Sequence, residues 1–180
     1  MAYIDPAPAE KMEAPKLKEF MAVADDLGLA DKQFFEVMAH APNYGEALFN
    51  AMQQAYVNGG VDVRVKEAIR IQLARLAGDE YFASLRSKKA MKAGLTEELI
   101  DAACGDFDKE PAFTDAHKWA FRYGYLMYRE PEKVNKEFYE EGKKHYSEAE
   151  ILELGNYMTI NFGMQSFIQT LKLIPVSDLR

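Results

Sequence analysis

The sequence predicts an all-α fold, with one helical domain over residues 15–180 and a short N-terminal arm over residues 1–14. Apolar residues recur at helical spacing along the domain, and residues typical of helix starts and ends separate these segments. No stretch of four or more residues alternates cleanly between polar and apolar, so no strand is expected. A chain of 180 residues, 48% of them hydrophobic and 28% charged, can bury one core without disulfides or metals.

Capping and breaking residues set the helix boundaries in the first half of the chain. Helices are expected at 16–27, 31–40, 43–58, 63–77 and 79–93, the last ending at Gly94. Gly28 ends the first helix, Pro42 separates the second from the third, and the glycine pair 59–60 stops the third. Asp62 is placed to cap the fourth helix, and Gly78 to end it.

The same signals continue in the second half. Helices are expected at 97–104, 114–130, 132–145 and 147–173, with a loop at 105–111. Thr96 and Thr114 precede their helices as N-caps, and Pro131 stops the aromatic-rich segment that follows Thr114. Ser147 and Glu150 have the spacing of a capping box, which predicts the start of the long final helix.

Charge and composition exclude several classes of function. There are 22 basic and 29 acidic residues, a net charge of −7, which argues against nucleic-acid binding. No apolar run approaches 18 residues, and the N-terminus lacks a basic region followed by an apolar one, so a cytoplasmic protein without a membrane span is expected.

Motifs for metals and cofactors are lacking too. The single cysteine, Cys104, excludes an internal disulfide, a Cys-x-x-Cys pair and a cysteine-rich zinc site. His40, His117 and His145 fall on different expected helices without metal-binding spacing. No phosphate loop, dinucleotide fingerprint or nucleophile elbow occurs, so neither a cofactor nor a metal is predicted.

Small residues mark one face of the final helix. Gly155, Thr159 and Gly163 are spaced four apart, so another helix backbone can approach closely, either within the chain or in a second subunit. Two glycines inside a helix cost about 1 kcal/mol each relative to alanine, which such packing would offset. Asn161 lies in the middle of the same helix and needs a partner if it is buried.

The region 62–94 resembles the core of the carboxymuconolactone decarboxylase and AhpD-type alkylhydroperoxidase superfamily. Two helices are joined at Gly78, Glu67 lies early in the first, and Ala-Gly-Leu-Thr-Glu-Glu follows at 93–98. The resemblance is good over about 40–104 and loose after 112. It implies a single all-α domain of this type that assembles as a homo-oligomer, either a trimer or a hexamer built from trimers.

The redox signature of that superfamily is only partly kept. Its Glu falls on Glu67, its two thiols on Asp79 and Phe82, and its His on Arg86. Cysteine-free relatives carry Glu-Trp and a His in this region, where this chain has Phe82-Ala83 and Arg86. A self-sufficient thiol peroxidase is therefore not expected, because such chemistry needs a thiolate and a resolving thiol.

The remaining side chains predict a different chemistry. The leading hypothesis is a cofactor-free lyase, such as a decarboxylase, that acts by proton transfer on a small carboxylated or lactone substrate. Glu67, Asp79 and Arg86 are the predicted catalytic residues, and Arg86, Tyr81 and Phe82 the predicted substrate-binding residues.

Three alternatives remain open at the level of the sequence. One is a binding or structural member of the fold without catalysis, and another is a peroxidase-related, antioxidant protein that has lost its thiols. For the residues themselves, the alternative is a salt bridge between Glu67 and Arg86 that only pins two helices together.

Overall fold

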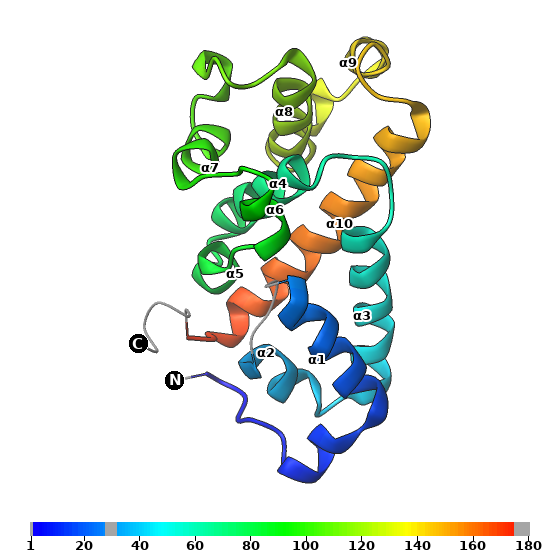
Figure 1. Cartoon of the computed structure of the whole chain (residues 1–180), viewed down its shortest axis with the longest axis vertical. Coiled ribbons are helices and arrows are strands. Elements are labelled where there is room, and N and C mark those ends of the chain that lie inside the picture. The colour runs from blue at the N-terminus through cyan, green and yellow to red at the C-terminus, as the bar shows by residue number, and fades with distance from the viewer. Residues whose placement is uncertain (1, 28–31, 175–180) are drawn as a thin grey trace.

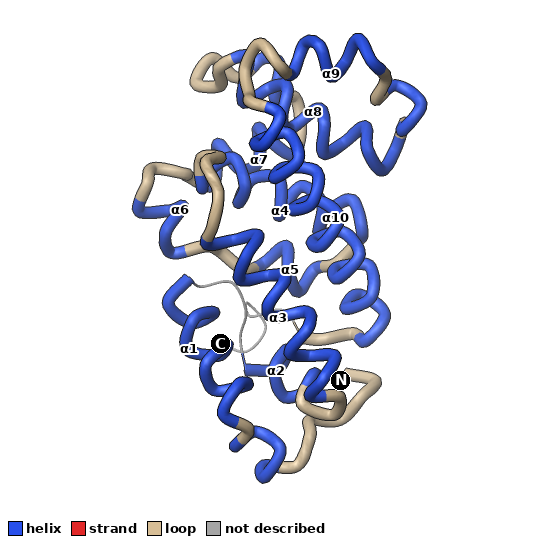
Figure 2. Tube along the Cα trace, turned by 90° about the vertical axis from the view of Figure 1, so that its right-hand side faces the viewer, coloured by secondary structure: helices blue, strands red, loops and turns tan. Residues whose placement is uncertain are grey.

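The computed structural model describes residues 2–27 and 32–174, and every regular element in these ranges is a helix (Figure 2). The α-helices are α1 (Pro15–Leu27), α2 (Lys32–Met38), α3 (Pro42–Val57), α4 (Val63–Ala77), α5 (Glu80–Ser84), α6 (Lys88–Lys92), α7 (Glu97–Cys104), α8 (Asp115–Arg129), α9 (Lys136–Gly142) and α10 (Glu148–Leu171). Short 3-10 segments are η1 (Ala9–Glu13), η2 (Phe107–Lys109) and η3 (Pro131–Lys133). The prediction of an all-α fold is confirmed. Gly28, expected to end the first helix, lies outside the described residues.

Helix α4 is the centre of the molecule. All residues from Val65 to Ala74 are buried, and α4 packs against α10, α7, α8, α5 and α6 (Figure 1). Its ends are those that the sequence predicts. The Asp62 carboxylate accepts a hydrogen bond from the Arg64 N–H at 2.8 Å, and Gly78 ends the helix in the left-handed conformation with φ of 72°.

Two apolar clusters lie on either side of this centre. One joins α4, α7, α8 and the first part of α10, and the other joins α1, α2, α3 and α5 to the end of α10. Helices α1, α2 and α3, which belong to the second cluster, lie in the lower half of the molecule in Figure 1. Helix α10 therefore spans both clusters and connects them.

The N-terminal segment packs against the second cluster. Ala7 is buried, and its N–H donates to the Glu36 carbonyl at 2.9 Å. The Tyr3 N–H donates to the Leu171 carbonyl, also at 2.9 Å, so the start of the described chain is fastened to the end of α10. Residues 9–13 form η1.

The continuous helix expected at 79–93 is wrong, because two short helices occupy this region. Helix α5 ends at Ser84, Leu85 is extended with ψ of 151°, and α6 begins after Ser87. The Ser87 hydroxyl caps α6 by accepting from the Ala90 N–H at 3.3 Å. The break at 85–87 contains neither Gly nor Pro, so Ser87 as an N-cap is its one local signal and no helix breaker marks it. Likewise, the helix expected at 132–145 is divided into η3 and α9.

The capping box that starts α10 is confirmed, with Ser147 and Glu150 bonded reciprocally. The two glycines of its small-residue face have different surroundings. A Cβ at Gly155 would lie 3.0 Å from the Tyr123 hydroxyl, so contact within the chain accounts for this glycine. A Cβ at Gly163 would meet nothing within 4 Å, so Gly163 has no such explanation within the described chain.

We propose that the Gly163 surface contacts a second subunit, and Gly163→Leu is expected to dissociate the assembly. A leucine on an open helix surface does not disturb the subunit itself, whereas overpacking a close contact costs about 1–3 kcal/mol. Light scattering on the wild type and on Gly163→Leu measures this. A wild-type mass of 20.5 kDa, that of one chain, at micromolar concentration would contradict the proposal.

Among the described helices, none combines the length and the apolar character needed to cross a membrane.

Candidate functional site

A buried ion pair lies on α4 at the position of the predicted catalytic glutamate. Arg70 follows Glu67 by one turn, and both side chains are almost fully buried. The Arg70 Nε donates to Glu67 Oε2 at 2.8 Å, and the Arg70 Nη2 donates to Glu67 Oε1 at 2.7 Å. This two-point geometry neutralises the Glu67 carboxylate inside the protein.

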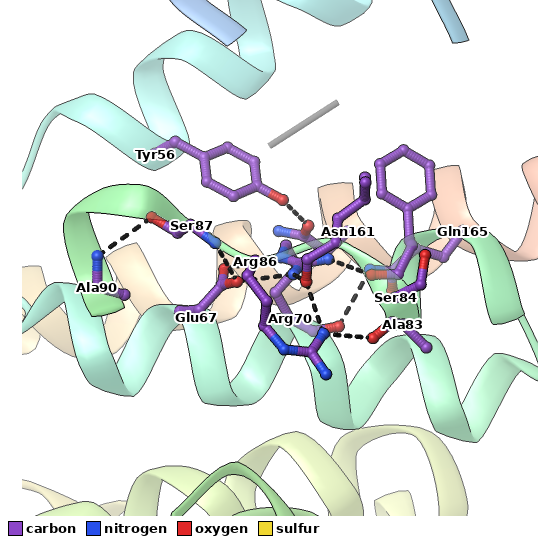
Figure 3. A network of polar contacts seen from close by, with 12 residues as sticks. Tyr56, Glu67, Arg70, Ala83, Ser84, Arg86, Ser87, Ala90, Asn161 and Gln165 are labelled. Carbon is purple, nitrogen blue, oxygen red and sulfur yellow. Dashed lines mark hydrogen bonds and ion pairs between the residues drawn. The ribbon is translucent and has the colours of Figure 1, made fainter. Parts of the chain in front are cut away.

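The same pair holds the break between α5 and α6 (Figure 3). Arg70 also donates to the Phe82 carbonyl at 2.6 Å and to the Leu85 carbonyl at 2.7 Å. Glu67 Oε1 accepts the Ser87 N–H at 2.7 Å. The hydrogen-bonding groups of the pair are therefore engaged in positioning this segment, which gives Glu67 a structural role.

The Arg86 side chain forms its ion pair with Glu97 and not with Glu67. Its Nε and Nη2 donate to the two carboxylate oxygens of Glu97 at 2.7 and 2.9 Å, and its Nη1 donates to the Ala83 carbonyl at 2.6 Å. The salt bridge between Glu67 and Arg86 that the sequence suggested is wrong, because Arg70 is the partner of Glu67. The break at 85–87 turns the Arg86 side chain toward the start of α7, which a continuous helix would not do.

Asp79 is the predicted catalytic residue that keeps a free functional atom. It caps α5, with Oδ1 accepting from the Tyr81 N–H at 3.1 Å and the Phe82 N–H at 3.4 Å. The residue is 2% exposed, and its Oδ2 is buried without a hydrogen-bond partner in the described structure. Burial raises the pKa of Asp79 to about 6, although the two N–H donors and the charge of Arg70 act in the opposite direction.

A polar cavity of about 140 Å³ adjoins Asp79. Its walls come from the start of α5 and the end of α10, and they are Gly78, Asp79, Glu80, Tyr81, Ile168, Gln169, Lys172 and Leu173. A cavity of about 150 Å³ is known to hold a molecule as large as benzene, so a small organic substrate fits this volume. Asp79 and the cavity together can bind a polar molecule and exchange a proton with it.

The two predicted substrate-binding aromatics have different surroundings. Tyr81 is buried and forms part of the cavity wall. Phe82 is fully buried in the second apolar cluster, where its ring centroid lies 5.6 Å from that of Phe34. Of the two residues, Tyr81 therefore lines the cavity, whereas Phe82 is part of the apolar core.

A second polar cluster, which the sequence did not reveal as a unit, adjoins the ion pair. The Tyr56 hydroxyl donates to the Asn161 side-chain carbonyl, and the Asn161 amide donates to the Tyr157 carbonyl at 2.8 Å. Asn161 thus has the partner that its position requires. Burial raises the pKa of Tyr56 and of Tyr157, so both phenols stay protonated. The adjoining crevice, about 10 Å³, is no larger than a water site.

Arg70 and Lys172 were not among the predicted site residues, and the local sequence contains a signal only for Arg70. Arg70 stands three positions after Glu67, a spacing that favours an ion pair on one helix face. Lys172 lines the Asp79 cavity from the end of α10, and nothing in the local sequence connects it to Asp79. Within the described ranges, no three His, Cys, Asp or Glu residues are grouped as metal ligands.

Asp79→Asn is expected to stabilise the protein at neutral pH. The folded carboxyl titrates near 6 and the unfolded one near 3.8, so the folded state binds the proton more tightly. The resulting stabilisation is fully present below about pH 4 and is lost as the pH rises through 6. Asparagine also caps helices well. The variant should therefore be more stable by about 1–3 kcal/mol at pH 7.5, with little difference at pH 4.

Urea denaturation of both proteins across this pH range provides the measurement. A wild-type protein that is more stable than Asp79→Asn at pH 7.5 would contradict the expected result.

Residues 42–123 match the sequence model of the carboxymuconolactone decarboxylase family. This match contains Glu67, Asp79 and Arg86, but ends before α10 and Lys172. No curated protein matches the sequence significantly.

Solved structures match nearly the whole chain. The debrominase Bmp8, solved as a cysteine-to-alanine variant in complex with 2,3,4-tribromopyrrole, superimposes with a TM-score of 0.79 at 18% identity, covering 97% of this chain and 91% of that one. A peroxidase-related protein with an alkylhydroperoxidase AhpD core, from Ralstonia eutropha, gives a TM-score of 0.79 at 13% identity, covering 97% and 92%. At these identities the likeness concerns the fold alone.

Proposed function

We propose that the chain is a member of the carboxymuconolactone decarboxylase family, whose model matches residues 42–123, and that it is a cofactor-free proton-transfer enzyme with Asp79 as its acid–base group. The observation that carries the proposal is that Asp79 lines the 140 Å³ cavity and that its buried Oδ2 has no hydrogen-bond partner among the described residues. A carboxyl group whose pKa is about 6 is suited to give and take protons near neutral pH.

The proposed substrate is a small carboxylated or lactone molecule, whose size fits a cavity of about 140 Å³. The proposed location is the cytoplasm. In a decarboxylation, the electron pair of the broken C–C bond stays on the substrate, CO₂ leaves, and protonated Asp79 supplies a proton to carbon. In an isomerisation, ionised Asp79 removes a proton beside a carbonyl and returns it to another carbon. Both reactions conserve atoms and electrons without a redox partner.

Thiol chemistry has weaker support in this chain. Burial raises the pKa of the Cys104 thiol to about 11, so little thiolate forms at neutral pH. The comparisons are equally compatible with a peroxidase-related role, which would require thiols from another molecule. Peroxide consumption in the presence of an added dithiol tests that alternative.

A non-catalytic binding protein is the second candidate, and a specific observation favours it. Two of the three predicted catalytic residues are engaged in ion pairs, Glu67 with Arg70 and Arg86 with Glu97. Such a protein would bind small molecules at the Asp79 cavity without turning them over.

Turnover by Asp79→Asn distinguishes these candidates. A panel of small lactones and keto acids, with a halogenated pyrrole added because of the Bmp8 likeness, is offered to the wild type, Asp79→Asn and Cys104→Ser. We expect turnover to fall at least 100-fold in Asp79→Asn, as is typical of a lost acid–base group. Cys104→Ser should be fully active. Undiminished turnover in Asp79→Asn would exclude Asp79 as the acid–base group, and binding without turnover by the wild type would favour the second candidate.

A further inference from the structure

We propose that Lys172 selects substrates that carry a carboxylate, by binding this group in the Asp79 cavity. The inference rests on the proposed function and extends it from the reacting group to the choice of substrate. The observations behind it are the backbone conformation of Lys172, the polar groups that line the cavity, and the unpaired ammonium charge of Lys172.

The backbone of Lys172 has an unfavourable conformation. Lys172 follows α10 with φ of 53° and ψ of 50°, in the left-handed region, and it is the one non-glycine residue with positive φ in the described chain. Glycine occupies the other positive-φ positions, Gly59, Gly78 and Gly94. A lysine in this conformation is strained relative to glycine. Strain of this kind is often found at functional sites.

The side chains around the cavity leave complementary groups unpaired. The Lys172 side chain is exposed, and neither its ammonium group nor the Gln169 amide has an ion pair or a side-chain hydrogen bond with another described residue. The Gln169 Nε2 lies 3.5 Å from the position of a Cβ at Gly78, which places the amide against the turn before Asp79. The residues that line the cavity thus include donor groups on Lys172 and Gln169 and the acceptor carboxylates of Asp79 and Glu80.

This arrangement fits a molecule with two different ends. A carboxylate accepts charge-assisted hydrogen bonds from an ammonium group. With its carboxylate on Lys172, the substrate can direct its reacting carbon toward Asp79. The negative charges of Asp79 and Glu80 oppose an anion, so without Lys172 the cavity would favour neutral or cationic molecules. Lys172 therefore decides whether carboxylates enter.

Equilibrium binding of butyrate and of its uncharged analogue butyramide tests the inference. Each is titrated at pH 7.5 into the wild type, Lys172→Met, Lys172→Arg and Asp79→Asn, with amide NMR shifts of Gly78 and Gln169 as the readout. We expect the wild type to bind butyrate about tenfold more tightly than butyramide, the size of a hydrogen bond between charged groups. Lys172→Met should lose this preference and Lys172→Arg should keep it.

The Asp79 variant separates this inference from the proposed function. Removing the negative charge of Asp79 should tighten butyrate binding, although it abolishes turnover. Lost turnover in Asp79→Asn together with an unchanged preference for butyrate in Lys172→Met would overturn the role of Lys172 alone. Absence of butyrate binding to the wild type would overturn it too. Normal turnover in Asp79→Asn with lost preference in Lys172→Met would overturn the proposed function instead.

A stability measurement completes the test. Lys172→Gly should relieve the backbone strain and raise the Tm by about 2–4 °C. The variant should also lose the preference for butyrate over butyramide. A lower Tm in Lys172→Gly would contradict the strain on which the inference partly depends.

Discussion

Arg70→Met is expected to lower the free energy of unfolding by about 3–5 kcal/mol, because it leaves the Glu67 carboxylate buried without its counter-ion. Both side chains of the pair are at most 1% exposed, so water cannot replace the lost partner. The carbonyls of Phe82 and Leu85 also lose their donor. Urea denaturation followed by circular dichroism measures the change.

Arg86→Met is the matched control. The side chains of Arg86 and Glu97, which form a bidentate pair, are 26% and 54% exposed. Exposed ion pairs contribute about 0–1 kcal/mol to the free energy of unfolding. The double variant Glu67→Gln/Arg70→Met should recover part of the loss, since no unpaired charge remains buried. Equal losses in Arg70→Met and Arg86→Met would show that burial of the pair does not govern its contribution.

Gly142→Ala is expected to destabilise the protein by about 1–3 kcal/mol or more, because the added methyl group has no room. A Cβ at Gly142 would lie 2.2 Å from Cζ2 of Trp119. The Trp119 ring is 2% exposed, its Nε1 donates to the Phe138 carbonyl at 3.1 Å, and it stacks on the Phe138 ring. The indole can therefore move only by giving up these contacts. Thermal unfolding monitored by tryptophan fluorescence records both the stability and the Trp119 environment.

Gly163→Ala provides the comparison for this substitution. It is also a helical glycine, but within the subunit its Cβ would meet nothing within 4 Å. At protein concentrations low enough to dissociate the proposed assembly, the gain in helix propensity should therefore raise the stability of the subunit by up to about 1 kcal/mol. A destabilisation of Gly163→Ala as large as that of Gly142→Ala would mean that contact with Trp119 is not the cause.

Local chemistry explains which parts of the fold could be predicted. Asp62 and Gly78 determine the ends of α4 through bonds within a few residues, and Ser147 with Glu150 does the same at the start of α10. The break at 85–87 depends instead on Arg70, which binds the Leu85 carbonyl from fifteen positions away. A hydrogen bond that forms only in the folded chain cannot be predicted from local sequence patterns.

The same distinction applies to the candidate site. Asp79 could be predicted as a site residue, because the family motif fixes its spacing from Glu67 along the sequence. The partner of Glu67 cannot be predicted in the same way, because the choice between Arg70 and Arg86 depends on the course of the chain after Ser84. Lys172 becomes relevant only when α10 brings its end to the start of α5.

The hydrogen bond from the Ser87 N–H to the Glu67 carboxylate limits how this amide exchanges with solvent. Ser87 lies between two helices of five residues each, a setting in which amide hydrogens normally exchange quickly with solvent. Its N–H is nevertheless held at 2.7 Å by a buried carboxylate of the central helix. Exchange at Ser87 then requires the opening of α4 itself, so the break at 85–87 and the core form one cooperative unit that opens and closes together.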